Sequence, residues 1–357
     1  MKKIFNLAVV ALICGAVAVG CCNGGKKSLL TKGDKSTLDT LSYCMGANLG
    51  EFVRTRIADI PFNFEKLDQG LEQAAFGKGK WSPEEAQEIF QQLIIPVNDR
   101  FGQLMRQKQD TTATAEPIQI FETEGQRDSL SYAYGLNIGN DLREGRFPIQ
   151  LYWYMQGFQQ TRNNEGKMDA EAIQNYLQHF FMVVYPEQEK AKSEAWLAKM
   201  EGKSGVQKCE SGLLYKVVKE GDVSRSATDD RDEVTVHYTG RDRDGEVFDS
   251  SIFENMPAQR QEMMRQYQPD NFDENGKIIE NEPVTFPLNR VIAGWTEGMK
   301  LVGPGGKIIL YIPSELAYGA RGNQSIAPNA ALEFEVELID VKPFEEPKTE
   351  EATQAAE

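Results

Sequence analysis

The feature that most limits what this chain can fold into is a repeat in its first half. Residues 38–50 read LDTLSYCMGANLG and residues 127–139 read RDSLSYAYGLNIG, with the same spacing of Leu, Ser, Tyr and Gly. Later segments align in the same order: 67–71 with 154–158, and 82–86 with 169–172. A period of about 90 residues is longer than the repeats of solenoid proteins. The repeat therefore predicts a small domain that is present twice.

Each copy has the pattern of packed helices. Leu41, Met45 and Leu49 lie at helical spacing, and Asp39 and Asp128 are predicted to cap the first helix of their copies. The shared Leu-Ser-Tyr segment is followed by a glycine, which is typical of close helix packing. We interpret its serine and tyrosine as structural.

Proline predicts where other helices begin or break. Ser82-Pro83 and the acids after it are typical of a helix start. Pro96 and Pro186 each interrupt an apolar helical run, so kinks or breaks are expected there. A last helix over 187–203 is expected to join the second copy to the next domain.

Length and charge limit the class of protein. The chain has 357 residues, which predicts two or three domains. Its formal net charge is -15, and no Lys/Arg block occurs beyond the N-terminus. A nucleic-acid partner is therefore not expected, because phosphate binding needs a basic surface. Cys22, Cys44 and Cys209 lack the spacing of a metal site or a redox pair.

The N-terminus is typical of an export signal. Lys2-Lys3 precede an apolar run over 4–19, which is shorter than a membrane span. Residues 18–21, AVGC, resemble a bacterial lipobox, which implies cleavage before Cys21 and acylation of that cysteine. A cleaved signal with an unmodified cysteine is the alternative. We expect an exported lipoprotein, anchored in the outer membrane and facing the periplasm.

Beyond residue 205 the pattern changes to short strands. Val234, Val236 and Tyr238 alternate onto one face, and the segment 332–338 alternates in the same way. The apolar stretch 291–299 between them has helical spacing and contains Trp295. The expected fold class is α+β: a C-terminal antiparallel sheet wrapped on one short helix, preceded by two all-α repeat domains.

Five ordered motifs in this region resemble the FKBP-type peptidyl-prolyl isomerases. They are VTVHYTG at 234–240, DGEVFDSS at 244–251, VIAGWTEG at 291–298, LAYG at 316–319 and LEFEVEL at 332–338. The upstream residues 193–197 and 211–217 are similar to the exported, macrophage-infectivity-potentiator branch of that family. This branch carries an N-terminal helical dimerisation domain, which the repeats resemble.

The resemblance implies a peptidyl-prolyl cis-trans isomerase (EC 5.2.1.8) with an apolar, tryptophan-floored pocket. By position, its catalytic residues are Tyr238, Phe248, Asp249, Trp295, Tyr318 and Phe334. Its substrate-binding residues are Val284, Phe286, Val291, Ile292 and Ile326. No cofactor and no metal are implied. The expected partners are exported proteins that fold with X-Pro bonds. The rival function is a non-catalytic holdase that grips unfolded clients.

The sequence departs from the family pattern beside the pocket. Ile252 follows Ser251 where the family often has an arginine nearby, so Asp249 lacks its usual cation unless Arg260 or Arg265 supplies it. The tip at 323–328 also differs. An insertion at 252–282 is either a lid or client contact, or a segment packed on the domain's flank. Within it, 271–282 imitates a calcium loop, although an Asn-Gly hairpin explains the same residues more simply.

The predicted organisation follows from these features. It comprises a signal peptide (1–20), a tether (21–35), repeat 1 (36–110), a linker (111–124), repeat 2 with the connecting helix (125–204), the isomerase domain (205–342) and a disordered acidic tail (343–357). Because both copies lie in one chain, we expect them to pair with each other and leave the protein a monomer. A homodimer formed through both copies is the alternative.

Overall fold

The computed structural model of the protein describes residues 35–109, 118–145 and 148–346. Within these ranges the chain divides into two compact units, and the boundary lies between Met182 and Val183. The signal peptide, nearly all of the tether including Cys21, the first half of the predicted linker and most of the acidic tail lie outside the described residues. None of the helices in the described ranges is long and apolar enough to cross a bilayer.

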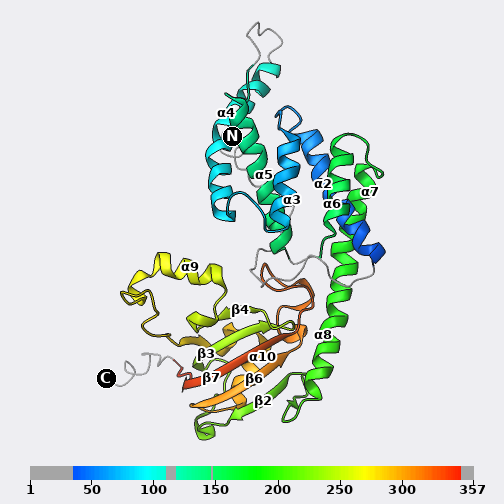
Figure 1. Ribbon diagram of the computed structural model, residues 1–357. Coiled ribbons are helices and arrows are strands. Elements are labelled where there is room, and N and C mark those ends of the chain that lie inside the picture. The colour runs from blue at the N-terminus through cyan, green and yellow to red at the C-terminus, as the bar shows by residue number, and fades with distance from the viewer. Residues whose placement is uncertain (1–34, 110–117, 146–147, 347–357) are drawn as a thin grey trace, which may run out of the picture. The chain divides into compact units, whose positions relative to one another are not determined.

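The first unit is all helical (Figure 1). Its α-helices are α2 (Lys35–Arg56), α3 (Phe64–Ala75), α4 (Pro83–Gln109), α5 (Glu124–Glu144), α6 (Leu151–Arg162) and α7 (Ala170–His179). A π-helical turn, η1 (Phe180–Val184), follows α7 directly in the chain and leads into α8 (Tyr185–Glu201). The second unit holds the strands, so the predicted α+β class is confirmed.

Two expectations about the helix limits are wrong. Asp39 and Asp128 lie inside α2 and α5, because each helix starts earlier; the cap of α5 is Thr123, whose side chain accepts the N–H of Gln126. Helix α4 also continues through Pro96 as one helix, so the expected break does not occur there, and the alternative, a kink, stays a prediction. The propensity penalty of a single proline is outweighed when the rest of the helix packs on a core.

Other predicted helix signals are confirmed. Ser82 and Glu85 exchange reciprocal hydrogen bonds before α4, with the Glu85 N–H on Ser82 Oγ at 3.1 Å and the Ser82 N–H on Glu85 Oε2 at 2.8 Å. This is a capping box. Pro186 stands in the first turn of α8, where a missing N–H costs no helical hydrogen bond.

The helices of the two copies pair by exchange. The first helix of copy one, α2, packs on the second helix of copy two, α6, and α5 packs on α3 in the same way. Glycines set both crossings: a Cβ at Gly46 would lie 1.9 Å from the Tyr154 carbonyl oxygen, and one at Gly135 would lie 2.0 Å from that of Leu67. The backbones can approach this closely only because these positions have no side chain.

The repeated serine and tyrosine also join one copy to the other. Ser42 Oγ accepts the N–H of Gln150 at 2.8 Å, and Ser131 Oγ accepts that of Asn63 at 2.9 Å. Tyr132 bonds across in the same manner to Gln73 and Lys80. The structural interpretation of this segment is therefore confirmed.

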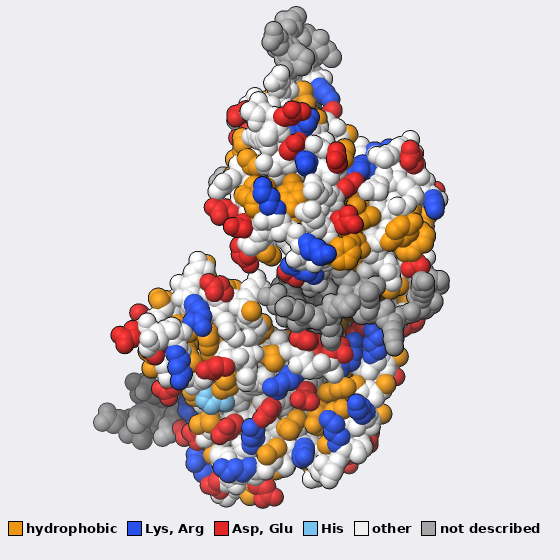
Figure 2. Space-filling model, in the orientation of Figure 1, with side chains coloured by type: hydrophobic (Ala, Val, Ile, Leu, Met, Phe, Trp, Pro, Cys, Tyr) orange, Lys and Arg blue, Asp and Glu red, His pale blue; other side chains and the backbone are white. Residues whose placement is uncertain are grey.

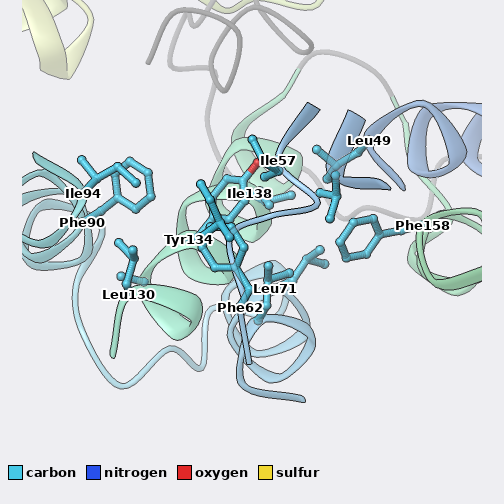
Figure 3. Packing of buried hydrophobic residues seen from close by; sticks show 14 of the residues in the cluster. Leu49, Ile57, Phe62, Leu71, Phe90, Ile94, Leu130, Tyr134, Ile138 and Phe158 are labelled. Carbon is cyan, nitrogen blue, oxygen red and sulfur yellow. The ribbon is translucent and has the colours of Figure 1, made fainter. Parts of the chain in front are cut away.

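One apolar core links the copies. Figure 3 shows Phe62 and Leu71 of the first copy against Tyr134 and Ile138 of the second, with Phe158 nearby. Tyr134 is 1% exposed and its ring lies 5.8 Å from that of Phe62. Because residues of both copies fill the same interior, neither copy completes this core by itself.

The second unit is a seven-stranded antiparallel sheet with strand order β1-β2-β6-β7-β3-β4, and β5 also pairs with β3. Its strands are β1 (Gln207–Lys208), β2 (Leu214–Lys219), β3 (Glu233–Asp242), β4 (Val247–Ser250), β5 (Val284–Pro287), β6 (Gly306–Ile312) and β7 (Leu332–Lys342). Its other helices are α9 (Ala258–Tyr267) and α10 (Ala293–Gly298).

Side chains of β6 alternate between the two faces of the sheet. Leu310 and Ile312 join the core that contains Trp295 of α10, whereas Tyr311 contacts Trp196 of α8 with ring centroids 5.7 Å apart. Helix α8 therefore belongs to this unit and runs beside β2 (Figure 1). On the face that Figure 2 shows, acidic and basic side chains of the described residues are interspersed.

Candidate active site

Neighbouring strands bring Tyr238 and Asp249 together. The Tyr238 hydroxyl donates to Asp249 Oδ2 at 2.7 Å. The two serines after Asp249 hold the Tyr238 backbone: Ser251 Oγ accepts its N–H at 2.9 Å, and Ser250 Oγ donates to its carbonyl oxygen at 2.9 Å. The Asp-Ser-Ser segment therefore fixes the register in which the phenol meets the carboxylate.

Three aromatic rings surround Trp295. Its indole lies 5.3 Å from the Tyr238 ring, 6.0 Å from that of Phe286 and 5.3 Å from that of Phe334, each nearly perpendicular. Phe248 extends the cluster through a 5.5 Å edge contact with Phe334. Edge-to-face contacts at these distances are favourable for aromatic rings.

Glycines make room for this arrangement. A Cβ at Gly240 would lie 2.7 Å from atoms of both the Phe248 and the Phe334 rings. On α10, Cβ atoms at Gly294 and Gly298 would lie 2.5–2.6 Å from side chains of β6. This close approach of α10 to β6 places Trp295 under the sheet's apolar face.

The segment between β6 and β7 adds Tyr318 and Ile326. Ile326 is 4% exposed, whereas Tyr318 is 39% exposed and keeps its ring accessible. Asn323 shapes the altered tip, since its side-chain oxygen accepts the N–H groups of Ser325 and Ile326. A polar turn thus holds Ile326 in the core.

The structure brings together the predicted apolar residues. Tyr238, Trp295, Ile326 and Phe334 belong to the core of the sheet, and Phe248, Val284, Phe286, Val291 and Ile292 pack against it partly buried. The Ile292 N–H donates to no other described residue, and the buried Trp295 Nε1 likewise has no partner among them. Such unpaired donors are uncommon, because burying one costs about 1–3 kcal/mol.

The electrostatics favour a protonated Tyr238. Burial raises the pKa of its phenol, and the hydrogen bond to Asp249 and the charge of that carboxylate raise it further. Burial also raises the pKa of Tyr318, with a smaller contribution from Asp249. Both hydroxyls are therefore hydrogen-bond donors at neutral pH.

The cation beside Asp249 comes from the insertion. Arg260 Nη1 donates to Asp249 Oδ1 and forms an ion pair with it. Arg265, the other predicted candidate, donates to the Gly276 carbonyl oxygen at 2.6 Å. The sequence named both arginines, and only the folded insertion distinguishes between them.

Helix α8 holds two edges of the site, which the sequence did not indicate. Ser193 Oγ accepts the N–H of Ala331, at the end of the segment that carries Tyr318, at 3.0 Å. Glu189, 4% exposed, pairs with Arg243 at 2.6 Å, in the turn between β3 and β4. A buried glutamate needs a partner. The sequence shows a glutamate in a charged helix, but it does not show that this one is buried.

Two hollows of this unit lie close to α8 and α10. One of about 300 Å³ lies between α8 and the β2 side of the sheet, and one of about 430 Å³ lies beside α10 at Val291 and Lys300. Trp295 itself is only 4% exposed. The ring and hydrogen-bond geometry defines the candidate site, and Val291, a predicted substrate-binding residue, lines the larger of these two hollows.

The stretch that imitates a calcium loop forms a hairpin turn. Asp273 Oδ1 accepts the N–H groups of Asn275 and Lys277, and Phe272 pairs antiparallel with Ile278. The simpler explanation of these residues is thus confirmed. No group of three or more His, Cys, Asp or Glu is placed to hold a metal within the described ranges.

Comparison with known proteins agrees with this geometry. Residues 224–339 match the family described as FKBP-type peptidyl-prolyl cis-trans isomerase. Residues 127–217 match the domain amino terminal to that isomerase, so this match begins in the second copy of the repeat.

Named relatives extend the match. The FKBP-type isomerase FkpA of Aeromonas hydrophila is 35% identical over 62% of this chain and 78% of its own length. A probable FkpA of Neisseria meningitidis is 36% identical over 59% and 73%. The crystal structure of FkpA from Escherichia coli is 31% identical, covering 62% of this chain and 99% of that one, with a TM-score of 0.39.

The fold class, the site and these relatives define an FKBP-type protein. The chain belongs to the FKBP-type peptidyl-prolyl cis-trans isomerases and is an enzyme of that class, as its motifs predicted.

Proposed function

We propose that the ring cluster around Trp295 is the catalytic site and that it isomerises X-Pro bonds by stabilising the twisted amide. The observation that carries this is the Tyr238–Asp249 hydrogen bond at the edge of the cluster, 2.7 Å long. It places an oriented polar pair beside otherwise apolar rings. That combination can hold one substrate residue in a defined position while the imide turns.

The apolar surroundings lower the barrier by differential binding. Rotation of a peptide bond passes through a twisted state about 18–20 kcal/mol above the planar one. The twisted amide has lost resonance, so its carbonyl is less polar than the planar carbonyl. An apolar site therefore disfavours the planar state more. No covalent bond changes, so the step requires neither a nucleophile nor a metal.

Two donors would position the substrate backbone. The accessible Tyr318 hydroxyl and the Ile292 N–H would bind carbonyl oxygens on either side of the proline, and Asp249 would orient Tyr238. Trp295 would form the floor against the proline ring.

Turnover of a short proline peptide by the mature chain tests this site. Trp295→Ala is expected to lower kcat/KM roughly 30-fold or more, from the loss of about 2–3 kcal/mol of transition-state contact. Tyr318→Phe, at an exposed ring, is expected to lower it severalfold without affecting stability. Wild-type turnover equal to the uncatalysed rate would favour the rival holdase. Normal turnover in both variants would place the site elsewhere.

The helical unit is proposed to act as a chaperone-like module for exported proteins with X-Pro bonds. Large apolar side chains stay exposed on it, among them Phe76 at 59%, Ile95 at 63% and Tyr152 at 65%. Such side chains can bind unfolded segments without a specific sequence. Aggregation of an unfolded protein should therefore be suppressed even by the Trp295→Ala variant. Loss of suppression together with turnover would assign both to one site.

The exchanged helix pairs support a monomer with an internal pseudo-dimer. Each crossing joins one copy to the other within the chain, α2 to α6 and α5 to α3. The surface that a second chain would use is then already covered. Light scattering should give the mass of one chain, and a stable dimer would overturn this proposal in favour of a homodimer.

The proposed location is the periplasmic face of the outer membrane, through acylation of Cys21. Its support is the AVGC segment at 18–21 after an apolar run. Cys21→Ser should abolish incorporation of labelled palmitate and release the protein from the membrane fraction. Unchanged fractionation would refute the anchor.

A further inference from the structure

The insertion between β4 and β5 is a folded module with a core of its own. Phe253 is 4% exposed and its ring lies 5.0 Å from that of Phe272. The Arg265 guanidinium stacks over both rings, at 4.9 and 5.0 Å from their centroids. Ile278, which pairs with Phe272, is 7% exposed. The segment is therefore ordered by its own contacts, and Figure 1 shows its helix α9 standing clear of the strands.

Helix α9 turns an apolar row away from that core. At 100° per residue, Arg260, Met263, Met264 and Tyr267 share one face, whereas Arg265 projects about 140° from Arg260. Met263 is 52% and Tyr267 71% exposed, and no residue of α9 is buried. One face of α9 thus packs on the module's core, and the other face is exposed.

The open face is attached to the site. Arg260, at the start of the row, forms the ion pair with Asp249, whose other oxygen accepts the Tyr238 hydroxyl. Asn255, just before α9, donates to Thr239 Oγ1 of β3 at 3.1 Å. At its far end the insertion is closed by Asn281, whose side chain accepts the Phe253 N–H at 2.7 Å. These contacts fix the beginning of α9 next to the carboxylate.

We propose that this module is an outer wall of the substrate site: Arg260 fixes α9 at Asp249, and the apolar row of Met263, Met264 and Tyr267 binds apolar residues of the polypeptide that flank its proline. The proposal rests on the proposed function, because it takes the cluster around Trp295 as the place where proline binds. Arg260 acts as a positioning residue, through Asp249.

The occupant follows from the geometry and the chemistry of the row. From Arg260 to Tyr267 the helix rises about 10 Å, the length of about three residues of an extended chain. A chain whose proline lies at the rings would therefore pass this row with its neighbouring residues. Methionine adapts to side chains of many shapes, which suits an enzyme that receives many sequences. A second copy of this chain is the competing occupant.

The test uses matched substrates on the mature, full-length chain. Two ten-residue proline peptides differ only in having Leu or Ser at the flanking positions, and a four-residue proline peptide serves as the substrate too short to reach the wall. The rates of cis-trans exchange are measured by NMR for wild type, for Met263→Ser/Tyr267→Ser, and for Arg260→Ala. Gln259→Ser/Gln266→Ser, on exposed positions of the same helix, is the matched control.

Wild type and the glutamine control should prefer the Leu-flanked peptide by about three- to tenfold in kcat/KM, and the Met263/Tyr267 variant should lose that preference. Arg260→Ala should lower kcat/KM on all three peptides by roughly two- to tenfold, with partial recovery in Arg260→Lys. It should have no further effect in an Asp249→Asn background.

The proposal that the row binds flanking residues would be refuted by equal rates on the Leu and Ser peptides in wild type. It would also be refuted if the Met263/Tyr267 variant kept the preference. Arg260→Ala with unchanged rates would overturn the positioning role. Self-association that the Met263/Tyr267 variant abolishes would assign the row to a second copy instead. Failure of the proposed site itself is distinguishable, because Trp295→Ala would then leave the four-residue peptide's rate intact.

Discussion

Buried tyrosines serve different purposes in the two units. In the helical unit, the Tyr132 hydroxyl donates to Gln73 and accepts the N–H of Lys80, so both of its hydrogen-bonding capacities are used within the fold. In the isomerase unit, Tyr238 donates to a carboxylate that also pairs with an arginine, and unpaired donors lie nearby. A tyrosine hydroxyl that both donates to and accepts from neutral groups of the fold, as in Tyr132, stabilises the structure. Tyr238, which is tied to a charged pair, belongs to the candidate site.

Glycine shows the same division of roles. In the helical unit it lets two backbones touch, whereas in the isomerase unit Gly240 makes room for two aromatic rings. Substitutions in the first unit should therefore act on stability alone. Those in the second should act on turnover as well, and the following changes test that difference.

The largest effect is expected for Gly135→Ala. The added Cβ would lie 2.0 Å from the Leu67 carbonyl oxygen, so α5 and α3 must separate. The free energy of unfolding of the helical unit should fall by about 3 kcal/mol, while peptide turnover at low temperature is retained. Gly102→Ala is the control: its Cβ would come no nearer than 3.6 Å to any atom, and it should stabilise α4 slightly. Equal melting of both variants would contradict the packing argument.

Glu189→Ala should act on the isomerase unit. It leaves Arg243, whose side chain is 15% exposed, with only the longer contact to Asp244 at 4.0 Å, which should cost about 2–3 kcal/mol of unfolding free energy. Turnover should fall too, because Arg243 lies in the turn that leads to Asp249. Lys192→Ala, which removes an exposed partner of Glu189 and keeps the Arg243 pair, should have little effect. If calorimetry shows only the helical unit destabilised, α8 does not support the sheet as described.

Removal of the hydroxyl should affect mainly stability at Tyr132 and mainly turnover at Tyr238. Tyr132→Phe leaves the Lys80 N–H without an acceptor and should cost about 1–2 kcal/mol of stability with normal turnover. Tyr238→Phe should lower kcat/KM by about threefold or more, from the coupling of contacting groups, with a smaller loss of stability. Denaturant titration and peptide turnover measured on both variants decide this. Reduced turnover in Tyr132→Phe would contradict the purely structural role of Tyr132.

The smallest effect is a difference in thiol reactivity, measured in a Cys22→Ser background. Burial raises the pKa of Cys44 in the helical unit to about 11, and burial followed by the charge of Glu297 raises that of Cys209 to about 11. Since only the thiolate reacts, maleimide labelling of Cys209 should accelerate about tenfold per pH unit between pH 8 and 10. Cys44, which is 0% exposed, should react only when its unit opens. Rapid labelling of Cys44 in the folded state would show that the helical unit opens readily.

Much of the site could be predicted because its residues are local in sequence. The Tyr238 segment, the Asp-Ser-Ser segment and the Trp295 helix each keep their motif, and alternation assigns their faces. The helix caps at Asp39 and Asp128 failed because a local signal competes with other residues that can start a helix one turn earlier. The break predicted at Pro96 failed for a related reason, because the packing of a long helix outweighs one missing hydrogen bond.

By itself, the sequence determined the helical first unit, the family, the sheet and the aromatic residues around Trp295, because these depend on periodicity and on motifs of a few residues. Only the tertiary structure decided that helices pair across the copies, that Arg260 and not Arg265 meets Asp249, and that Glu189 and Ser193 of α8 hold the edges of the site. Each of these contacts joins residues that are distant in the chain, or selects one of two nearby residues of the same type. Chain geometry selects among such partners, and residue type alone does not.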